Sequence, residues 1–314
     1  MKVLLANPRG FCAGVERAIR IVELALVRYG PPVYVRHGIV HNQQVIAALQ
    51  EKGAIFVANP SDAPANSVMV FSAHGVSPAV RREARDAGHQ VVDATCPLVT
   101  KVHLEARRYA ETGNEILLIG HVDHVEVEGT RGEAPEQTQV VEVPEDVERL
   151  VVRDPNRLAV LTQTTLSVDD TREVIDALRA RFPKISTPHR DDICYATQNR
   201  QDAVKQLAAR ADLVFVVGSP ESSNGMRLVE TARRLGCEVI QIESAVEIDR
   251  ERVNAVECIG ITAGAAVPKP VVEAVVARIA ELYEGAIEVE EMQGVEEAMH
   301  FSLPAAVCGM QDHA

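Results

Sequence analysis

The chain has 314 residues, of which 46% are apolar and 25% are charged, and its formal net charge is −13. This length predicts two or three domains. The acidic balance excludes broad binding of nucleic acid or anionic membrane, because those partners require basic surface. No apolar stretch approaches the roughly 20 residues of a membrane span, and the first residues contain too short an apolar run for a signal sequence. We therefore expect a cytoplasmic protein with reduced cysteines.

Short apolar segments alternate with amphipathic helical patterns along the whole chain, which predicts an α/β protein with mainly parallel sheets. The expected strands cover residues 3–6, 33–35, 68–71, 90–92, 115–119, 158–161, 213–217, 238–241 and 258–262. The expected helices include residues 15–29, 101–111, 169–181, 197–210, 227–235 and 270–283.

Three cysteines stand at the same kind of position. Cys12, Cys96 and Cys194 each follow an extended segment and open a helical pattern. The N-terminus of a helix gathers unpaired N–H groups and partial positive charge, which favours the thiolate form of a cysteine. The cysteines divide the chain into predicted α/β domains at 1–95, 96–193 and 194–285, followed by a C-terminal tail at 286–314.

Other polar or small residues recur in register with the cysteines. One set follows each cysteine at a nearly constant spacing, and a second set lies at a later strand end. The first set is His41, His124 and Ser223, and the second is His74, Thr164 and Ala266. Ligands of open parallel sheets bind beyond the carboxyl ends of the strands. We therefore expect a trefoil of three pseudo-threefold-related domains around a central metal-cluster cavity.

Three thiolates from distant segments would hold a metal centre that lacks one protein ligand. Buried structural cysteines and an open zinc site are alternatives, but an all-thiolate open site favours an iron–sulfur cluster. The remaining cysteines, at positions 237, 258 and 308, fit the role of small buried apolar residues.

The polar residues of the repeat suit an anionic ligand. Imidazoles such as those of His41, His74 and His124 donate hydrogen bonds to phosphate oxygens without a large basic patch. The run Ser222, Ser223 and Asn224 follows a strand and precedes a helix, as in a phosphate-binding loop. The other histidines fit surface or satisfied core positions, namely His89, His103, His189, His300 and His313, whereas His37 and His121 stay undecided.

Glu126 and Thr164 complete the candidate set. Glu126 alternates with valines, so a half-buried strand or a solvated face is one interpretation. The other is that burial raises the pKa of this carboxyl and allows it to pass a proton. The hydroxyl of Thr164 would then hold water or relay that proton.

Several motifs resemble the 4-hydroxy-3-methylbut-2-enyl diphosphate reductase family, in order from residue 3 to about residue 280. They are NPRGFCAGV, HGIVHN, FSAHGVS, DATCPLVTKVH, EVEGT, TQTTLSVDDT, DDICYATQNRQ and SSN followed by RL. The resemblance implies a trefoil of three α/β domains around a 4Fe–4S cluster, one iron of which has no cysteine ligand. It also implies reductive dehydroxylation of an allylic diphosphate to isopentenyl and dimethylallyl diphosphate, the last step of the non-mevalonate isoprenoid pathway.

The resemblance also implies roles for individual residues. The cluster ligands would be Cys12, Cys96 and Cys194, and Glu126 would supply the proton with Thr164 close to the substrate hydroxyl. The diphosphate would lie against His41, His74, His124, Ser222, Ser223, Asn224 and the loop that contains Ala266. The expected electron donor is a carrier such as ferredoxin or flavodoxin.

The chain departs from the family pattern at three places. Ala266 stands where serine is usual, and Gly225 replaces a serine. Val125 replaces the proline that usually follows the third histidine, and Asp123 adds a carboxylate beside His124. We expect backbone N–H groups at 264–266 to compensate at the first place. Two other functions stay open at this point, an iron–sulfur sensor or scaffold without turnover and a zinc-dependent diphosphate-ester hydrolase.

Overall fold

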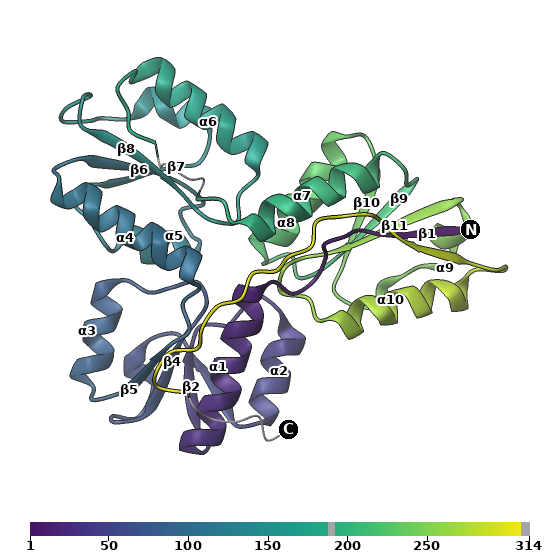
Figure 1. Ribbon diagram of the computed structural model, residues 1–314, viewed down its shortest axis with the longest axis horizontal. Coiled ribbons are helices and arrows are strands. Elements are labelled where there is room, and N and C mark those ends of the chain that lie inside the picture. The colour runs from purple at the N-terminus through teal and green to yellow at the C-terminus, as the bar shows by residue number, and fades with distance from the viewer. Residues whose placement is uncertain (188–191, 309–314) are drawn as a thin grey trace. The chain divides into compact units, whose positions relative to one another are not determined.

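The computed structural model describes residues 1–187 and 192–308, and its three sheets are all built from parallel strand pairs. Sheet A has the strand order β10-β9-β11-β1-β12, sheet B has the order β3-β2-β4-β5, and sheet C has the order β7-β6-β8 (Figure 1). The chain divides into two compact units. The first contains sheet A, and the second contains sheets B and C.

The first unit consists of residues 1–13, 41–43 and 195–300. Its strands are β1 (Lys2–Leu5), β9 (Leu213–Val217), β10 (Glu238–Ile242), β11 (Cys258–Ala263) and β12 (Glu288–Glu291). Its helices are α7 (Tyr195–Ala208), α8 (Ser223–Arg234), the 3-10 helix η3 (Ala245–Glu247), α9 (Arg250–Asn254) and α10 (Lys269–Leu282). Strand β1 lies between β11 and β12, so the first strand of the chain belongs to a sheet that is otherwise formed by later residues.

The second unit consists of the remaining described residues. The part with sheet B contains α1 (Ala13–Tyr29), β2 (Val33–Arg36), α2 (Gln43–Glu51), β3 (Ala54–Val57), η1 (Pro60–Asp62), β4 (Val68–Phe71), α3 (Pro78–Asp86) and β5 (Gln90–Asp93). The part with sheet C contains α4 (Pro97–Glu111), β6 (Glu115–Ile119), α5 (Val125–Arg131), β7 (Thr138–Val141), η2 (Pro144–Arg149), β8 (Leu158–Thr162) and α6 (Val168–Arg181).

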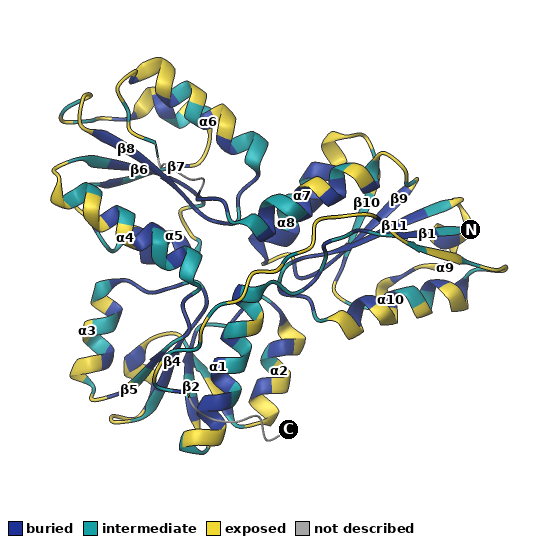
Figure 2. Cartoon of the chain, in the orientation of Figure 1, coloured by how far each residue is buried: buried dark blue, intermediate teal, exposed yellow. Residues whose placement is uncertain are grey.

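Fully buried strands and amphipathic helices account for the packing of the helices against the sheets. Every residue of β8 and β9 is buried, as expected for a parallel strand that is covered on both faces. In α10 the buried residues lie on one side, whereas the opposite side is exposed (Figure 2). Full burial of one large apolar side chain, such as Phe215 in β9, contributes about 1.5–3 kcal/mol.

The predicted α/β class with three parallel sheets is confirmed, and each candidate cysteine stands directly before a helix. Three strands (β3, β7 and β12) and four α-helices (α2, α3, α5 and α9) were not among the predicted elements. The strand interpretation of the segment around Glu126 was wrong, because His124 caps a helix there. The trefoil placement and the domain boundaries at 95, 193 and 285 stay predictions. Within the described residues, no helix has the length and apolarity that a membrane span requires.

Candidate functional site

The three candidate cysteines stand at helix N-termini and belong to no disulfide within the described residues. Cys12 and Cys194 immediately precede α1 and α7, and Cys96 is the N-cap residue of α4. All three are partly exposed. The partial positive charge of a helix N-terminus stabilises a thiolate, so each position suits a metal ligand or a reactive thiol.

The backbone of each cysteine is fixed to a loop that follows another strand. The N–H groups donate to carbonyl oxygens as follows: Cys12 to Ala265 (3.3 Å), Cys96 to Ala73 (3.0 Å) and Cys194 to Thr164 (3.0 Å). These acceptors are the residue before Ala266, the residue before His74, and Thr164 itself. The repeat that the sequence indicated therefore exists as a repeated backbone hydrogen bond.

A cation near the start of each following helix holds the loop that leads into a different cysteine. The three contacts are Arg17 Nη1 to Thr95 O (3.1 Å), Lys101 Nζ to Asp192 Oδ1 (3.0 Å) and Arg200 Nη2 to Gly10 O (2.8 Å). The helix after Cys12 thus supports Cys96, the helix after Cys96 supports Cys194, and the helix after Cys194 supports Cys12. Sequence reasoning missed all three cations, although each lies five or six positions after a candidate cysteine.

The donor set fits an iron–sulfur cluster, because three thiols at helix N-termini supply the sulfur ligands that such clusters take. Cys12 lies in the first compact unit, and Cys96 and Cys194 lie in the second. Within residues 1–187 and 192–308 no three His, Cys, Asp or Glu side chains are grouped as a metal-ion site. The meeting of the three thiols stays a prediction.

Glu126 is a buried acid in contact with Thr164. Its side chain is 2% exposed. Oε1 accepts the N–H of Thr164 at 2.6 Å, and Oε2 lies 3.1 Å from the Thr164 hydroxyl, which donates to it. Burial raises the pKa of Glu126 to about 7, against the opposing effect of these two hydrogen bonds. Such a carboxyl can hold a proton near neutral pH and release it to a bound molecule.

A second buried acid, Asp192, was not among the predicted residues. It is 4% exposed, and burial raises its pKa to about 7 although Lys101 favours the charged form. Its Oδ2 accepts the N–H of Thr162 at 3.0 Å. The only sequence signal is its position two residues before Cys194. The negative charge of Asp192 also contributes to the raised pKa of Glu126.

Two of the predicted histidines lie together in the second unit. The ring centroids of His74 and His124 are 6.0 Å apart in an edge-on arrangement. The Nδ1 atom of His124 accepts the N–H of Glu126 at 3.1 Å, so the neutral ring carries its proton on Nε2. An Nε2–H group is a hydrogen-bond donor of the kind that a phosphate oxygen requires.

The first unit holds the remaining predicted polar residues at the start of α8. The hydroxyl oxygen of Ser222 accepts the N–H of Gly225 at 3.3 Å, which leaves its O–H able to donate. Asn224 is 4% exposed and its Nδ2 donates to the Thr197 hydroxyl at 3.3 Å. Ser223 is also buried, whereas His41 is partly exposed and lies two residues before α2.

The expected compensation by backbone N–H groups at 264–266 is wrong for two of the three residues. Gly264 donates to the carbonyl of Val217 at 2.9 Å, and Ala265 donates to Asn224 Oδ1 at 2.9 Å. These bonds join the loop to β9 and to α8, so neither N–H faces a ligand. Ala266 is 7% exposed and contributes a methyl group where a hydroxyl was expected.

The histidines and cysteines outside the candidate site differ in how far they are buried. His89 and His103 are buried and hydrogen-bonded, as predicted for core histidines, and His300 is exposed. His189 and His313 lie outside the described residues. The prediction that Cys308 is buried was wrong, since it is exposed, and Cys237 and Cys258 are only partly buried.

Comparison with known proteins gives matches over most of the chain. A family model described as "LytB protein" matches residues 3–280. The chain is 54% identical over 307 residues to proteins named 4-hydroxy-3-methylbut-2-enyl diphosphate reductase. The one from Methylococcus capsulatus is matched over 97% of both chains, and the one from Escherichia coli K12 over 97% of this chain and 96% of the relative.

Two solved structures are also similar. The first is described as the E-1-hydroxy-2-methyl-but-2-enyl-4-diphosphate reductase from Plasmodium falciparum. Its TM-score is 0.92 at 37% identity, over 98% of this chain and 96% of that one. The second is described as (E)-4-hydroxy-3-methyl-but-2-enyl diphosphate reductase, the terminal enzyme of the non-mevalonate pathway. It has a TM-score of 0.64 at 31% identity, over 89% of this chain and 99% of that one.

Proposed function

The chain belongs to the LytB protein family, and from this premise we propose that it reduces 4-hydroxy-3-methylbut-2-enyl diphosphate to isopentenyl and dimethylallyl diphosphate. This reaction is the last step of the non-mevalonate route to isoprenoids. The observation that carries the proposal is the buried Glu126 carboxyl, whose pKa is raised to about 7 and which contacts Thr164. The carbonyl of Thr164 in turn accepts the N–H of Cys194, so the acid is tied to a candidate metal ligand.

The reaction breaks one C–O bond and forms one C–H bond. It consumes two electrons and two protons, and the hydroxyl oxygen leaves as water. The protein therefore needs an electron-transfer group, a proton donor and an anchor for the diphosphate.

The residues proposed to hold the electron-transfer group are Cys12, Cys96 and Cys194. A 4Fe–4S cluster bound there, with one iron free of cysteine, would supply electrons and a Lewis acid for the hydroxyl oxygen. The helix N-termini at all three positions support the thiolate ligands that such a cluster needs.

The diphosphate is proposed to lie against the predicted hydrogen-bond donors. His74 and His124 lie in the second unit, and Nδ1 of His124 accepts the N–H of Glu126, which places the proton of the neutral ring on Nε2. The donors from the first unit are His41, Ser222, Ser223 and Asn224. These are neutral donors, so an acidic protein can bind an anion without a broad basic surface.

Glu126 is proposed to hold the proton that the reaction consumes. Its two hydrogen bonds from Thr164 orient the carboxyl, and its burial keeps it protonated up to about neutral pH. The electron donor is proposed to be a small carrier such as ferredoxin or flavodoxin, and the cytoplasm is the proposed compartment.

Anaerobic assay with the hydroxylated diphosphate and a chemical reductant tests the proposal. Formation of both isomeric products, strictly dependent on reductant, is expected. A sensor or scaffold would show cluster absorbance without turnover, and a zinc hydrolase would release phosphate without reductant. The relatives described above are named as reductases and give these two alternatives no support. The matched variant is Glu126→Gln, which should lose turnover and keep its cluster absorbance.

A further inference from the structure

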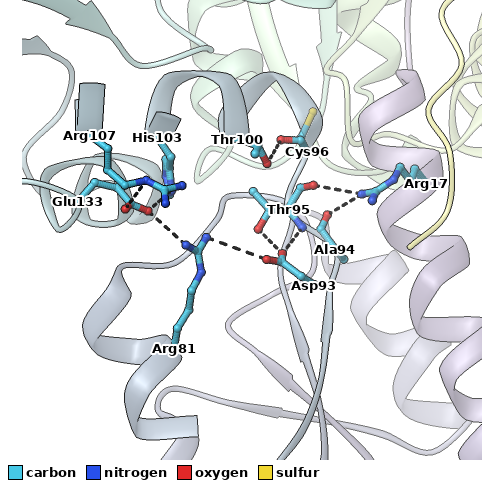
Figure 3. A network of polar contacts seen from close by, with 10 residues as sticks. All are labelled: Arg17, Arg81, Asp93, Ala94, Thr95, Cys96, Thr100, His103, Arg107 and Glu133. Carbon is cyan, nitrogen blue, oxygen red and sulfur yellow. Dashed lines mark hydrogen bonds and ion pairs between the residues drawn. The ribbon is translucent and has the colours of Figure 1, made fainter. Parts of the chain in front are cut away.

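His103 is a buried imidazole in α4 that is held by a buried carboxylate. Its side chain is 1% exposed, and its Nδ1 lies 2.9 Å from Oε1 of Glu133. The Glu133 side chain is fully buried and also lies 3.3 Å from guanidinium nitrogens of Arg81 and of Arg107 (Figure 3). A carboxylate between two cations can only accept hydrogen bonds, so the proton of the His103–Glu133 bond lies on Nδ1.

The other edge of the His103 ring lies between two glycines. A methyl group at Gly75 would lie 2.9 Å from Cε1 and 3.1 Å from Nε2, and a methyl group at Gly129 would lie 3.3 Å from both atoms. Such distances leave no free space between the ring and either backbone. Within the described part of the chain, Nε2 has no hydrogen-bond partner, so this edge acts through contact alone.

The two glycines belong to segments that carry predicted site residues. Gly75 directly follows His74, and Gly129 lies one helical turn after Glu126 in α5, which His124 caps. The ring of His103 therefore packs against both the His74 turn and the helix of the proposed proton donor, at the place where the Gly75 and Gly129 backbones also approach each other. The helix that carries His103 is α4, whose N-cap residue is Cys96.

The carboxylate partner extends this support toward Cys96. Arg81, which contacts Glu133, also lies 4.0 Å from Asp93 Oδ2 (Figure 3). The other Asp93 oxygen, Oδ1, accepts the N–H of Thr95 at 2.9 Å, and Thr95 immediately precedes Cys96. Glu133, which follows α5, thus contacts Arg81 at the start of α3. Through Arg81 and Asp93 it is linked to the loop before Cys96.

We propose that the His103–Glu133 pair is a positioning unit that sets the spacing between His74 and the Glu126 helix. The proposal rests on the proposed function, because it assigns the pair to the diphosphate and proton-donor side of that site. His103 touches no predicted substrate contact through its polar atoms, so it acts through the segments on which those contacts lie.

Gly129→Ala is the variant that separates positioning from folding. Alanine is a better helix former than glycine by about 1 kcal/mol, which offsets part of the cost of packing the added methyl group, so the variant should still fold. The added methyl group must displace the His103 ring or α5 by a few tenths of an ångström. Because small misplacement of reacting groups slows catalysis strongly, we expect kcat/KM to fall about fivefold to fiftyfold, with cluster absorbance per chain unchanged.

His103→Asn completes a double-mutant cycle. Asparagine keeps an N–H donor for Glu133 and removes the ring edge, so it should lower kcat/KM by a similar factor. In the His103→Asn background, Gly129→Ala should have almost no further effect, because the methyl group then meets only the Gly75 backbone, at an ordinary contact distance of 3.5 Å. Equal fold losses in both backgrounds, or no loss in Gly129→Ala, would overturn the proposal. If His103→Asn does not fold, the comparison of diphosphate binding between Gly129→Ala and the wild type still decides the proposal.

Binding of inorganic diphosphate to the same proteins, measured by calorimetry, gives a readout that needs no turnover. We expect weaker binding in Gly129→Ala than in the wild type, and equal binding in the two proteins would contradict the inference. Failure of the wild type to reduce its substrate would refute the proposed function. The calorimetric comparison of diphosphate binding would still decide whether the pair positions His74 and α5.

Discussion

Replacement of Thr164 by valine should move the pH dependence of catalysis to higher pH. The change removes the hydroxyl that donates to Glu126 Oε2 at 3.1 Å and keeps the backbone N–H that donates to Oε1 at 2.6 Å. Both bonds stabilise the charged carboxylate and so hold its pKa below the value that burial alone would give. The loss of one of them must raise the pKa of Glu126 further.

The size of the shift follows from the energy of the lost bond. A hydrogen bond to a charged group is worth about 1.5–3 kcal/mol, and one pKa unit corresponds to about 1.4 kcal/mol. The hydroxyl distance is longer than the 2.5–2.7 Å of strong bonds to carboxylates, which favours the lower end of the range. We therefore expect the pKa of Glu126 to rise from about 7 to about 8.

The assay is kcat as a function of pH, from about pH 6 to pH 9.5, under anaerobic conditions with saturating substrate. If Glu126 donates the proton, kcat declines about tenfold per unit above its pKa. The midpoint of this decline should lie about one unit higher in Thr164→Val, whatever happens to the maximal rate. Thr164→Ser keeps a hydroxyl and serves as the matched control. An unchanged midpoint in Thr164→Val, or one at lower pH, would refute the reasoning.

Three other changes test neighbouring parts of the site. Asp192→Asn removes a negative charge that raises the pKa of Glu126, so the alkaline decline of kcat should move to lower pH; an upward movement would contradict this. Glu297→Ala leaves the fully buried Arg200 without the carboxylate that lies 3.0 Å away, which should cost about 3–5 kcal/mol of stability. Thermal unfolding of Glu297→Ala and of Glu297→Gln measures that loss, and a Glu297→Gln variant as stable as the wild type would argue against a charge effect. Ala266→Ser should lower KM for the diphosphate by about tenfold, as a hydrogen bond to a charged acceptor predicts; an unchanged or higher KM would show that the hydroxyl is not missed.

The cysteine-bearing turns could be predicted because their signals are local. Each cysteine follows a short apolar segment and precedes a run with helical periodicity, and neither signal depends on the rest of the fold. The same reasoning missed β12, whose sequence EVEE resembles a solvated acidic tail. This strand exists because it pairs with β1 and because Glu290 lies 2.5 Å from Lys2 and 2.8 Å from Arg210.

The supporting residues of the site could not be predicted, because their partners are distant in sequence. His103 and Glu133 are 30 positions apart, and Glu133 lies in a stretch of charged and small residues that resembles an exposed loop. Arg200 and Glu297 are 97 positions apart. Only the folded chain shows that these charges are buried in pairs. By contrast, Glu126 could be assigned a role from sequence although its secondary structure was uncertain.

The hydrogen bonds around the cysteines explain why the repeat is difficult to see in the sequence. The N–H group of each candidate cysteine donates to a backbone carbonyl oxygen. A carbonyl is present whatever side chain the acceptor residue has. The equivalent loops are therefore free to carry an imidazole at His74, a hydroxyl at Thr164 and a methyl group at Ala266. In the proposed diphosphate site, the loss of a hydroxyl at Ala266 would remove a ligand contact and leave the support of Cys12 intact. For the same reason, Ala266→Ser should change KM without changing the amount of cluster bound, and a change in both would show that the anchor and the side chain are not independent.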